Sequence, residues 1–424
     1  MSDACAIIYT TGETRIRDDR PDALCDVLFE PMIGWVNDAL DAAGIKERCY
    51  VFAKNAEAFS AYTGDAPVFA GEEGANLPFA AKDWVAERGD RDVLVLRAET
   101  PFLCGETISS ARTYHIQNGQ KLTILASGGR EAMIRELNSS AYWVKADFLF
   151  ELFQHIDPKE EKFLPLALAY LSDQVENAAT FVAAKKELYL TAADPLELLK
   201  LNAAARTLVL TKLCRAGVEF LCTDGILIGP SVTVGKGTTV LPGTILKGTT
   251  AIGEGCEIGP NSYLENCSVG DGCKIFATKM ADAVLKDGVK IGPFSQIRPG
   301  TVVGEGVKIG DYVEIKNSSI GAKTSVAHLT YIGDADVGEG VNFGCGVCVA
   351  NFDGQKKSRT VIGDNAFLGC NTNLVAPVKV GAFAYTAAGT TVTEDVPDEA
   401  LCIGRARQEN KEGWVRQHDQ IRKK

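Results

Sequence analysis

The stretch GILIGPSVTVGKGTTVLPGTILKGTTAIGEGCEIGPNSYL, residues 225–264, carries an aliphatic side chain at every sixth position. Glycine, which accepts backbone angles that other residues resist, is frequent between these positions. A six-residue period stacks each short strand above a strand of the next coil, so the aliphatic side chains form a ladder inside a parallel β-helix. The unbroken part of this ladder contains Ile228, Val234, Val240, Leu246, Ile252, Ile258 and Leu264.

The ladder changes phase after Leu264 and then returns twice. A flexible linker is the alternative explanation for a glycine-rich segment, but a linker does not keep aliphatic residues in phase. We therefore predict a β-helix with three hexads in each coil over residues 221–415. The later ladder positions are Ile291, Ile297, Val303, Ile309 and Ile315, followed by Ile362, Leu368, Leu374, Val380 and Val392.

The first part of the chain, residues 1–194, has a different pattern. Apolar runs typical of strands alternate with stretches typical of helices, which predicts an α/β domain with a largely parallel, Rossmann-like sheet. Pro31 is predicted to open one helix, and residues 78–86 another. The clearest strands are CAIIY (5–9), CYVFA (49–53), DVLVL (92–96) and LTILA (122–126).

Between these two regions the segment PLELLKLNAAARTLVLTKLCRAG, residues 195–217, consists largely of strong helix formers. We predict that residues 195–220 form a linker helix between the two domains. Residues 416–424 are then left as a C-terminal tail.

Composition narrows the class of protein. The net charge of −11 and the pI near 5.1 argue against a nucleic-acid partner, because binding a phosphate backbone needs a basic face. Thirteen cysteines without framework spacing indicate reduced thiols. The sequence has neither a signal-peptide pattern nor an apolar run long enough to cross a membrane, so we expect a cytoplasmic protein without a membrane partner.

The motifs of the second region resemble the acetyltransferase domain of the GlmU family. This bacterial family combines a glucosamine-1-phosphate N-acetyltransferase with a UDP-N-acetylglucosamine pyrophosphorylase. The resemblance implies a left-handed β-helix, a homotrimer with sites between neighbouring subunits, acetyl-CoA as donor and glucosamine 1-phosphate as acceptor. The motifs, which run from Ile297 to Trp414, are IRPGTVVGEGVKIGDYVEIKNSSIG, HLTYIGDADVGEGVNFGCG, NFDGQKKSRTVIG, LVAPVKVG, AAGTTVTEDVP and QENKEGW.

Acetyl transfer to an amine needs a base, and histidine suits this role near neutral pH. The chain has four histidines, of which His328 sits in a repeat segment beside other polar residues. The resemblance makes His328 the general base and Glu314 the carboxylate that orients or polarises it. The alternative is a turn histidine that only forms hydrogen bonds.

A sugar phosphate requires cations that converge on one point. By resemblance, Arg298, Lys316 and Lys357 hold the substrate phosphate, and Tyr331 and Asn342 contact the sugar. Each cation by itself is more simply explained as a solvated surface charge. Their joint occurrence inside the family motifs favours a binding site.

The tetrahedral intermediate of acetyl transfer needs hydrogen-bond donors for its oxyanion. The resemblance assigns this role to the Asn351 amide and to the backbone N–H of Cys370, where the family has serine. Phe352 stands where the family usually has tyrosine. Cys345 and Cys348 form a CGVC run, but no second pair follows at zinc-ligand spacing. The acetyl-CoA contacts implied by the resemblance are Cys345, Cys370, Ala388, Arg405 and, near the thioester end, Trp414.

The first domain departs from the family. The family loop AAGxGTRM, followed by Pro-Lys-x-Leu, is here TTGETR (10–15) followed by PDAL (21–24), so Asp22 replaces the lysine. Gly12 and Arg15 remain as candidate contacts to UTP, and Glu99 and Asp194 as ligands of Mg²⁺ if this domain is active. A carboxylate near a triphosphate adds repulsion, so we expect a degenerate nucleotidyltransferase domain of the GT-A-like type that acts as a scaffold or a relaxed binding module.

Three functions follow from this pattern. The leading one is acetyl transfer from acetyl-CoA to glucosamine 1-phosphate in the synthesis of UDP-N-acetylglucosamine, a precursor of peptidoglycan. An alternative is a bifunctional enzyme that also transfers uridylyl from UTP. A third is a non-catalytic trimeric scaffold or nucleotide-sugar sensor, against which the retained His328, Arg298 and Asn351 speak.

Overall fold

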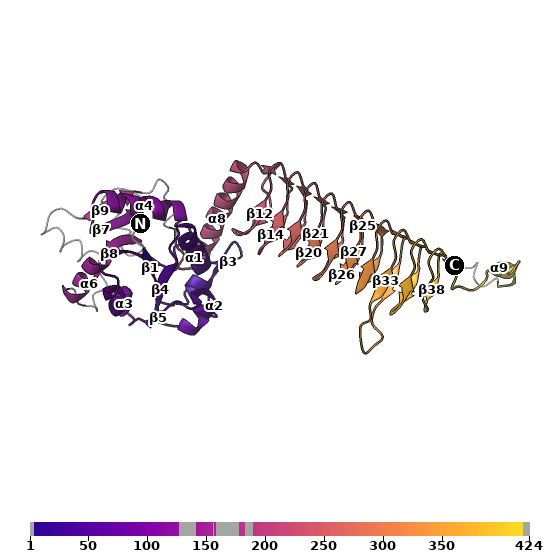
Figure 1. Cartoon of the computed structure of the whole chain (residues 1–424), viewed down its shortest axis with the longest axis horizontal. Coiled ribbons are helices and arrows are strands. Elements are labelled where there is room, and N and C mark those ends of the chain that lie inside the picture. The colour runs from indigo at the N-terminus through magenta and orange to yellow at the C-terminus, as the bar shows by residue number, and fades with distance from the viewer. Residues whose placement is uncertain (1–3, 127–140, 156, 158–177, 183–189, 419–424) are drawn as a thin grey trace. The chain divides into compact units, whose positions relative to one another are not determined.

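The computed structural model describes residues 4–126, 141–155, 157, 178–182 and 190–418, so residues 419–424 of the predicted tail lie outside it. The chain divides into two compact units, Met1–Thr211 and Lys212–Lys424 (Figure 1). Each unit has a different architecture and is described by itself.

The first unit contains a sheet in the order β5-β4-β1-β6-β8-β7-β9. Strand β8 runs antiparallel to its neighbours β6 and β7, and the other pairs are parallel. The largely parallel sheet and the four expected strands are therefore confirmed. The strands are β1 (Cys5–Thr10), β4 (Glu47–Phe52), β5 (Val68–Ala70), β6 (Asp92–Arg97), β7 (Leu122–Ala126), β8 (Tyr142–Lys145) and β9 (Ala178–Val182), and β2 (Asp26–Val27) pairs separately with β3 (Glu30–Pro31).

Helices cover both faces of this sheet, which makes the first unit a three-layer α/β structure. Helices α1 (Met32–Ala42) and α4 (Gly105–Gln117) bury Ile33, Leu40 and Ile108 against one face. Helices α3 (Lys82–Ala86) and α6 (Ala146–His155) pack on the other face. The helix expected at 78–86 is a 3₁₀ helix, η3 (Leu77–Ala81), followed by α3, with Pro78 in the first turn of η3. The shortest elements are η1 (Asp22–Leu24), η2 (Ala56–Phe59) and α2 (Ser60–Thr63).

Helix α8 (Pro195–Arg215) confirms a long helix from residue 195, but it ends at Arg215 instead of residue 220, and residues 219–220 already belong to a strand. After it, the second unit is a parallel β-helix whose short strands pass in turn through three sheets. We call these sheets face 1, face 2 and face 3. Face 1 begins with β10 (Glu219–Phe220), β13 (Thr239–Val240) and β16 (Glu257–Ile258) and ends with β39 (Leu401–Cys402). Face 2 begins with β11 (Leu227–Ile228), β14 (Ile245–Lys247) and β17 (Tyr263–Glu265) and ends with β38 (Thr391–Val392). Face 3 begins with β12 (Thr233–Val234), β15 (Ala251–Ile252) and β18 (Ser268–Val269) and ends with β36 (Lys379–Val380). Figure 1 shows the strands as rows, from β12 and β14 to β33 and β38.

The aliphatic ladder fills the interior of the β-helix. Every ladder residue expected from the sequence is buried, which confirms the hexad reading. Between Leu264 and Ile291 the ladder continues through Val269, Ile275, Met280 and Leu285. Three of these steps have five residues instead of six, as between Leu264 and Val269, and this shortening causes the change of phase.

One coil carries an insertion. Strand β32 (Cys348–Ala350) is separated from β33 (Thr360–Ile362) by residues 351–359, which project from the row of coils near β33 (Figure 1). An antiparallel bridge between Phe352 and Lys357 closes this loop on itself. We call residues 351–359 the projecting loop.

All thirteen cysteines are free, as their spacing predicts. Within the described part of the chain, no helix is both long and apolar enough to cross a lipid bilayer.

Candidate functional site

The corner between face 1 and face 2 aligns residues from successive coils. Backbone hydrogen bonds run up this corner, such as those from the Leu329 N–H to the Asp311 carbonyl at 3.0 Å and from the Gly346 N–H to the His328 carbonyl at 3.4 Å. On the next two coils the Asn371 N–H donates to the carbonyl of Cys345 and the Gly389 N–H donates to the carbonyl of Cys370, at 2.8 Å each. We call the aligned residues the corner column: Asp311, His328, Cys345, Cys370 and Ala388.

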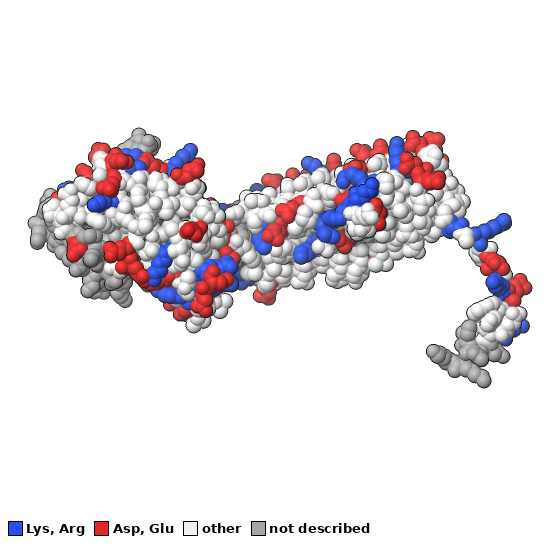
Figure 2. Space-filling view, turned by 90° about the horizontal axis from the view of Figure 1, so that it is seen from below, with Lys and Arg blue, Asp and Glu red and all other residues white. Residues whose placement is uncertain are grey.

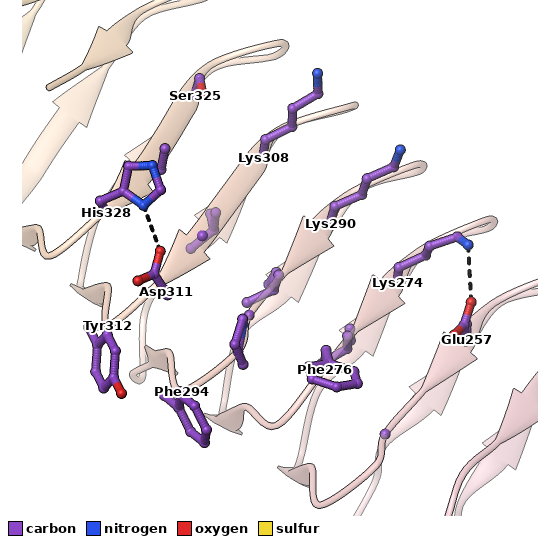
Figure 3. A pocket seen from close by; sticks show the side chains of 18 residues that line it. Glu257, Lys274, Phe276, Lys290, Phe294, Lys308, Asp311, Tyr312, Ser325 and His328 are labelled. Carbon is purple, nitrogen blue, oxygen red and sulfur yellow. Dashed lines mark hydrogen bonds and ion pairs between the residues drawn. The ribbon is translucent and has the colours of Figure 1, made fainter. Parts of the chain in front are cut away.

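His328 contacts a carboxylate of the preceding coil. Its Nδ1 lies 2.6 Å from Oδ1 of Asp311, and the two residues are register partners at the ends of β28 (Ser325–His328) and β25 (Lys308–Asp311) (Figure 3). The hydrogen bond with His328 lowers the pKa of Asp311 from its usual value. The imidazole is 60% exposed, so its other ring nitrogen is accessible to a substrate.

The contact expected between Glu314 and His328 is not the one that forms. Glu314 begins β26 (Glu314–Lys316) on face 2, and its Oε1 accepts a hydrogen bond from Nη1 of Arg298 at 2.7 Å. Its register partner on the next coil is Tyr331 of β29 (Tyr331–Gly333). The chain therefore places Asp311, at the end of a face 1 strand, beside the imidazole.

The three cations expected to hold a phosphate converge on face 2. The Arg298 N–H donates to the carbonyl of Ile315, so Arg298 lies level with Lys316 on the neighbouring coil. Contact with Lys357 and the charge of that ammonium group lower the pKa of Lys316, with smaller contributions from desolvation and from Arg298. Figure 2 shows Lys and Arg side chains gathered partway along the β-helix. Crowding of this kind favours a bound anion.

A buried carboxylate that sequence reasoning missed links these groups. Asp334 accepts hydrogen bonds from Nδ2 of Asn317 at 2.6 Å and from Nδ2 of Asn351. Burial raises the pKa of Asp334, but these hydrogen bonds and the charges of Lys316 and Lys357 outweigh burial, and the pKa is lowered. Asp334 therefore fixes the amide of Asn351 and adds a negative charge beside the two ammonium groups.

Tyr331 and Asn351 meet above Gly333. A Cβ atom at Gly333 would lie 2.4 Å from the Tyr331 hydroxyl and 2.8 Å from Nδ2 of Asn351, so only glycine leaves room for both. Asn342 does not join them within one chain. It lies in β31 (Asn342–Phe343) on face 1, as the exposed register partner of Ser325.

A groove of about 750 Å³ on face 1 ends at His328 and Asp311 (Figure 3). The lysines Lys274, Lys290 and Lys308 stand on consecutive rungs along it. The aromatic rings of Phe276, Phe294 and Tyr312 also line it, and all three are exposed. Sequence reasoning missed this groove, although two of its exposed aromatic residues, Phe294 and Tyr312, are separated by the length of one coil.

The positions assigned to acetyl-CoA follow His328 along the corner column. Cys345, Cys370 and Ala388 occupy its next three rungs, and a Cβ atom at Gly389 would lie 3.6 Å from Cδ of Arg405. Among the described residues, none accepts a hydrogen bond from the N–H of Cys370, so this donor is available. Trp414 lies in α9 (Trp414–Gln417), where its ring stacks on His418 with 4.3 Å between the ring centroids.

In the first unit, Asp22 occupies the loop that was expected to bind nucleotide phosphates. The carboxylate of Asp22 is 2% exposed and accepts the N–H of Ile16 at 2.9 Å. Nε of Arg15 lies 3.1 Å from Asp22 and 2.8 Å from Glu13, so its charge is already paired. Gly12 has a φ of +70° and packs against the Lys54 carbonyl. The loop thus binds the carboxylate of Asp22, a residue of the same chain, through the Ile16 N–H and Arg15.

The two carboxylates expected to bind Mg²⁺ are engaged in other contacts. Glu99 is 2% exposed, accepts a hydrogen bond from the Thr10 hydroxyl and pairs with Nε of Arg97 at 3.3 Å. Oδ1 of Asp194 accepts the N–H of Glu197 at 2.8 Å and so caps α8. The described residues contain no group of three or more His, Cys, Asp or Glu side chains suited to a metal. These contacts do not fit Mg²⁺, which needs several free oxygen ligands.

Comparison with known proteins gives matches to both halves of the chain. Residues 282–317 match the family described as bacterial transferase hexapeptide (six repeats). The bifunctional protein GlmU of Thermoanaerobacter pseudethanolicus is 37% identical over 95% of each chain, and that of Caldanaerobacter subterraneus is 36% identical over 98% of each chain. A nucleotidyl transferase structure from Methanothermobacter, 17% identical, covers 48% of this chain and 97% of its own, with a TM-score of 0.37.

Proposed function

This chain belongs to the GlmU family, and from that premise we propose that it transfers an acetyl group from acetyl-CoA to the amine of glucosamine 1-phosphate. The product is N-acetylglucosamine 1-phosphate, an intermediate in the synthesis of UDP-N-acetylglucosamine. One observation carries the proposal. His328 ends the strand β28, and the next strand along the chain is β29. Strand β29 pairs with the segment from Glu314 to Lys316 on the preceding coil. The exposed imidazole and the cluster of cations therefore lie on two neighbouring coils.

In the proposed reaction His328 acts as the general base. Nε2 of His328 takes a proton from the substrate amine as the amine nitrogen bonds to the thioester carbonyl carbon. Collapse of the tetrahedral intermediate breaks the carbon–sulfur bond. The sulfur then leaves with the proton that His328 held, so the base is regenerated.

The phosphate of the acceptor is assigned to Arg298, Lys316 and Lys357. A phosphate dianion between these groups relieves the repulsion that lowers the pKa of Lys316. Glu314 has a supporting role, because its carboxylate holds the Arg298 guanidinium. Tyr331, the register partner of Glu314 on the following coil, is assigned to the sugar.

Two donors are assigned to the oxyanion of the tetrahedral intermediate. Asn351 gives one Nδ2 hydrogen to Asp334 and retains a second for the substrate. The N–H of Cys370 is the other donor, two rungs above His328 on the corner column. Acetyl-CoA itself is assigned to the stretch of the column from Cys345 to Ala388, with Arg405 at its far end.

We propose that neighbouring subunits of a homotrimer complete the site. The side chains of His328 and Asp311 are 60% and 39% exposed at the end of the groove, and a site this open does not surround a small ligand as binding sites do. Asn342 also faces away from Tyr331 on face 1, so a second copy has to bring it to the sugar. Mixing His328→Ala with Asn342→Ala subunits tests this. Regained activity supports shared sites, whereas a monomer with full activity excludes them.

The experiment that tests the function measures free CoA released by the purified protein from acetyl-CoA and glucosamine 1-phosphate. We expect release with the wild type and a loss of about 10²–10⁴-fold in His328→Ala. Glucosamine 6-phosphate and unphosphorylated glucosamine test the acceptor. CoA release no greater than that of His328→Ala would overturn the assignment.

For the first unit we propose a scaffold without uridylyl transfer, because Asp22 fills the phosphate loop and Glu99 and Asp194 are engaged elsewhere. The family relatives are bifunctional proteins, so this proposal needs its own test. Pyrophosphate release from UTP and N-acetylglucosamine 1-phosphate with Mg²⁺ would show that the unit retains uridylyl transfer.

A further inference from the structure

The contact between Asp311 and His328 is built into the backbone. Both residues end face 1 strands, and each is followed by a corner residue with positive φ, Tyr312 at 54° and Leu329 at 46°. The Leu329 N–H donates to the carbonyl of Asp311 at 3.0 Å, which holds the two coils in this register. The two short side chains therefore leave the backbone at equivalent points and meet at 2.6 Å.

The nearest rival carboxylate is committed elsewhere. Glu314 pairs with Arg298, while the only side-chain partner of Asp311 within the described residues is His328. Other ionisable groups around the imidazole are Lys308 on β25, Cys345 on the following coil, and Tyr312 and Tyr331 on either side of the corner. None of these is a carboxylate, so among the residues that the structure describes Asp311 is the one anion that accepts a hydrogen bond from the ring.

This contact contributes little to folding. The side chains of His328 and Asp311 are 60% and 39% exposed, and ion pairs exposed to this degree contribute little to stability. The contact between Asp311 and His328 has a larger effect on the tautomer and the proton affinity of the imidazole. A carboxylate that accepts the Nδ1 hydrogen fixes the neutral tautomer, in which Nε2 carries the free lone pair, and it stabilises the imidazolium that forms when Nε2 takes a proton.

We infer that Asp311 is the positioning residue for the base His328, and that Glu314 serves the phosphate subsite through Arg298. This inference rests on the proposed acetyl transfer. It divides two carboxylates, three residues apart in the sequence, between two different steps. Asp311 acts on proton transfer, and Glu314 acts on acceptor binding. The lowered pKa of Asp311 supports this division, because the group stays ionised throughout the neutral range.

The test compares Asp311→Asn, Asp311→Ala and Glu314→Gln by steady-state kinetics across pH. We expect Asp311→Ala to lower kcat by about 10- to 100-fold, the range known for metal-binding histidines that lose their hydrogen-bonded carboxylate, with little change in KM for glucosamine 1-phosphate. Asp311→Asn keeps an acceptor atom but loses the charge. For this variant we expect the acidic limb of the kcat/KM profile to move to lower pH.

Glu314→Gln should show the opposite pattern, with a raised KM for glucosamine 1-phosphate and an unchanged acidic limb. Glu305→Gln, an exposed carboxylate on another corner, is the matched control and should behave as the wild type. Thermal unfolding of each variant separates these effects from loss of structure.

The outcomes are distinguishable from failure of the proposed function. If His328→Ala keeps full activity, the acetyl-transfer mechanism itself fails. If His328→Ala is inactive while Asp311→Ala and Asp311→Asn match the wild type in kcat and pH profile, the mechanism stands and the role of Asp311 is overturned. A shift of the acidic limb in Glu314→Gln alone would return the positioning role to Glu314.

Discussion

Lys316 lies so close to Lys357 that the second ammonium group lowers the pKa of the first. Two like charges are held together in the free protein, on a surface that also carries Arg298. The arrangement is unfavourable without an anion, and this gives acceptor binding a measurable proton linkage.

Binding of glucosamine 1-phosphate should therefore take up protons in alkaline buffer. The dianion raises the pKa of Lys316 from its lowered value, so Lys316 regains a proton that it has partly lost at high pH, and affinity falls as pH rises. Calorimetry in two buffers of different ionisation enthalpy measures this uptake. Lys357→Ala should remove it, and equal uptake in that variant would contradict the linkage.

Gly333→Ala should impair the site without unfolding the β-helix. The added methyl group would lie 2.4 Å from the Tyr331 hydroxyl and 2.8 Å from Nδ2 of Asn351, so both side chains must move away from their present positions. We expect a loss of about 10-fold or more in kcat/KM, since small displacements of catalytic groups are costly. Normal activity with an unchanged melting temperature would show that neither side chain is used in its present position.

Asp334→Asn should release the projecting loop. Asn351 then loses its charged acceptor, and Lys316 and Lys357 lose a neighbouring negative charge. Trypsin should cut faster after Lys356, Lys357 and Arg359, which all lie in the loop, and kcat should fall with the misplaced Asn351 amide. Asp336→Asn is the comparison, because Asp336 anchors the loop only through Arg359. Unchanged proteolysis in Asp334→Asn would show that the loop holds itself in place.

The ladder could be predicted because it depends on one physical requirement that the sequence displays directly. Each interior position needs an aliphatic side chain, and the period of these residues is the period of the strands. The neighbours on the outer surface depend instead on coil length. Around the site, one of the three steps in each coil has five residues instead of six, as between Ile315 and Ile320. Residues that stack on neighbouring coils are therefore 17 positions apart in the sequence, not the 18 that three hexads predict.

This shortened coil explains what sequence reasoning missed. Asn317, Asp334 and Asn351 are equally spaced and stack in the structure, as do Asp311 and His328. The equal spacing is visible in the sequence, but only the structure shows which step of the coil is short. Glu314 was assigned to His328 by family resemblance and not by spacing, and in the structure it pairs with Arg298. The convergence of Arg298, Lys316 and Lys357 was found because family motifs marked each residue separately.

The first unit should lose stability in mildly acidic solution. His115 is fully buried, with Nδ1 2.9 Å from the Thr123 hydroxyl, and burial lowers its pKa from 6.5 to about 4. Between these two pKa values the unfolded chain has a protonated His115, whereas the folded unit keeps it neutral. The free energy of unfolding therefore has its full value above pH 6.5 and declines as pH falls toward 4. The shift corresponds to about 3 kcal/mol.

Urea unfolding followed by tryptophan fluorescence measures this effect in the full chain. Trp35, Trp84 and Trp143 lie in the first unit, and the β-helix coils contain no tryptophan. The midpoint should fall across this pH range in the wild type, and the slope should be smaller in His115→Gln. An equal slope in both proteins would assign the loss to other groups.

Stacking has a consequence for how the protein responds to heat. Each coil is hydrogen-bonded only to the coil before it and the coil after it, and β39 (Leu401–Cys402), at the end of face 1, has a neighbour on one side only. Such stacks fray from their ends. Ala388 and Arg405 belong to the fraying end, whereas His328 and Lys316 lie several coils further in. Because acetyl-CoA is assigned to the fraying end and the amino sugar to inner coils, we expect warming to weaken donor binding first, so that turnover ceases while the fold persists.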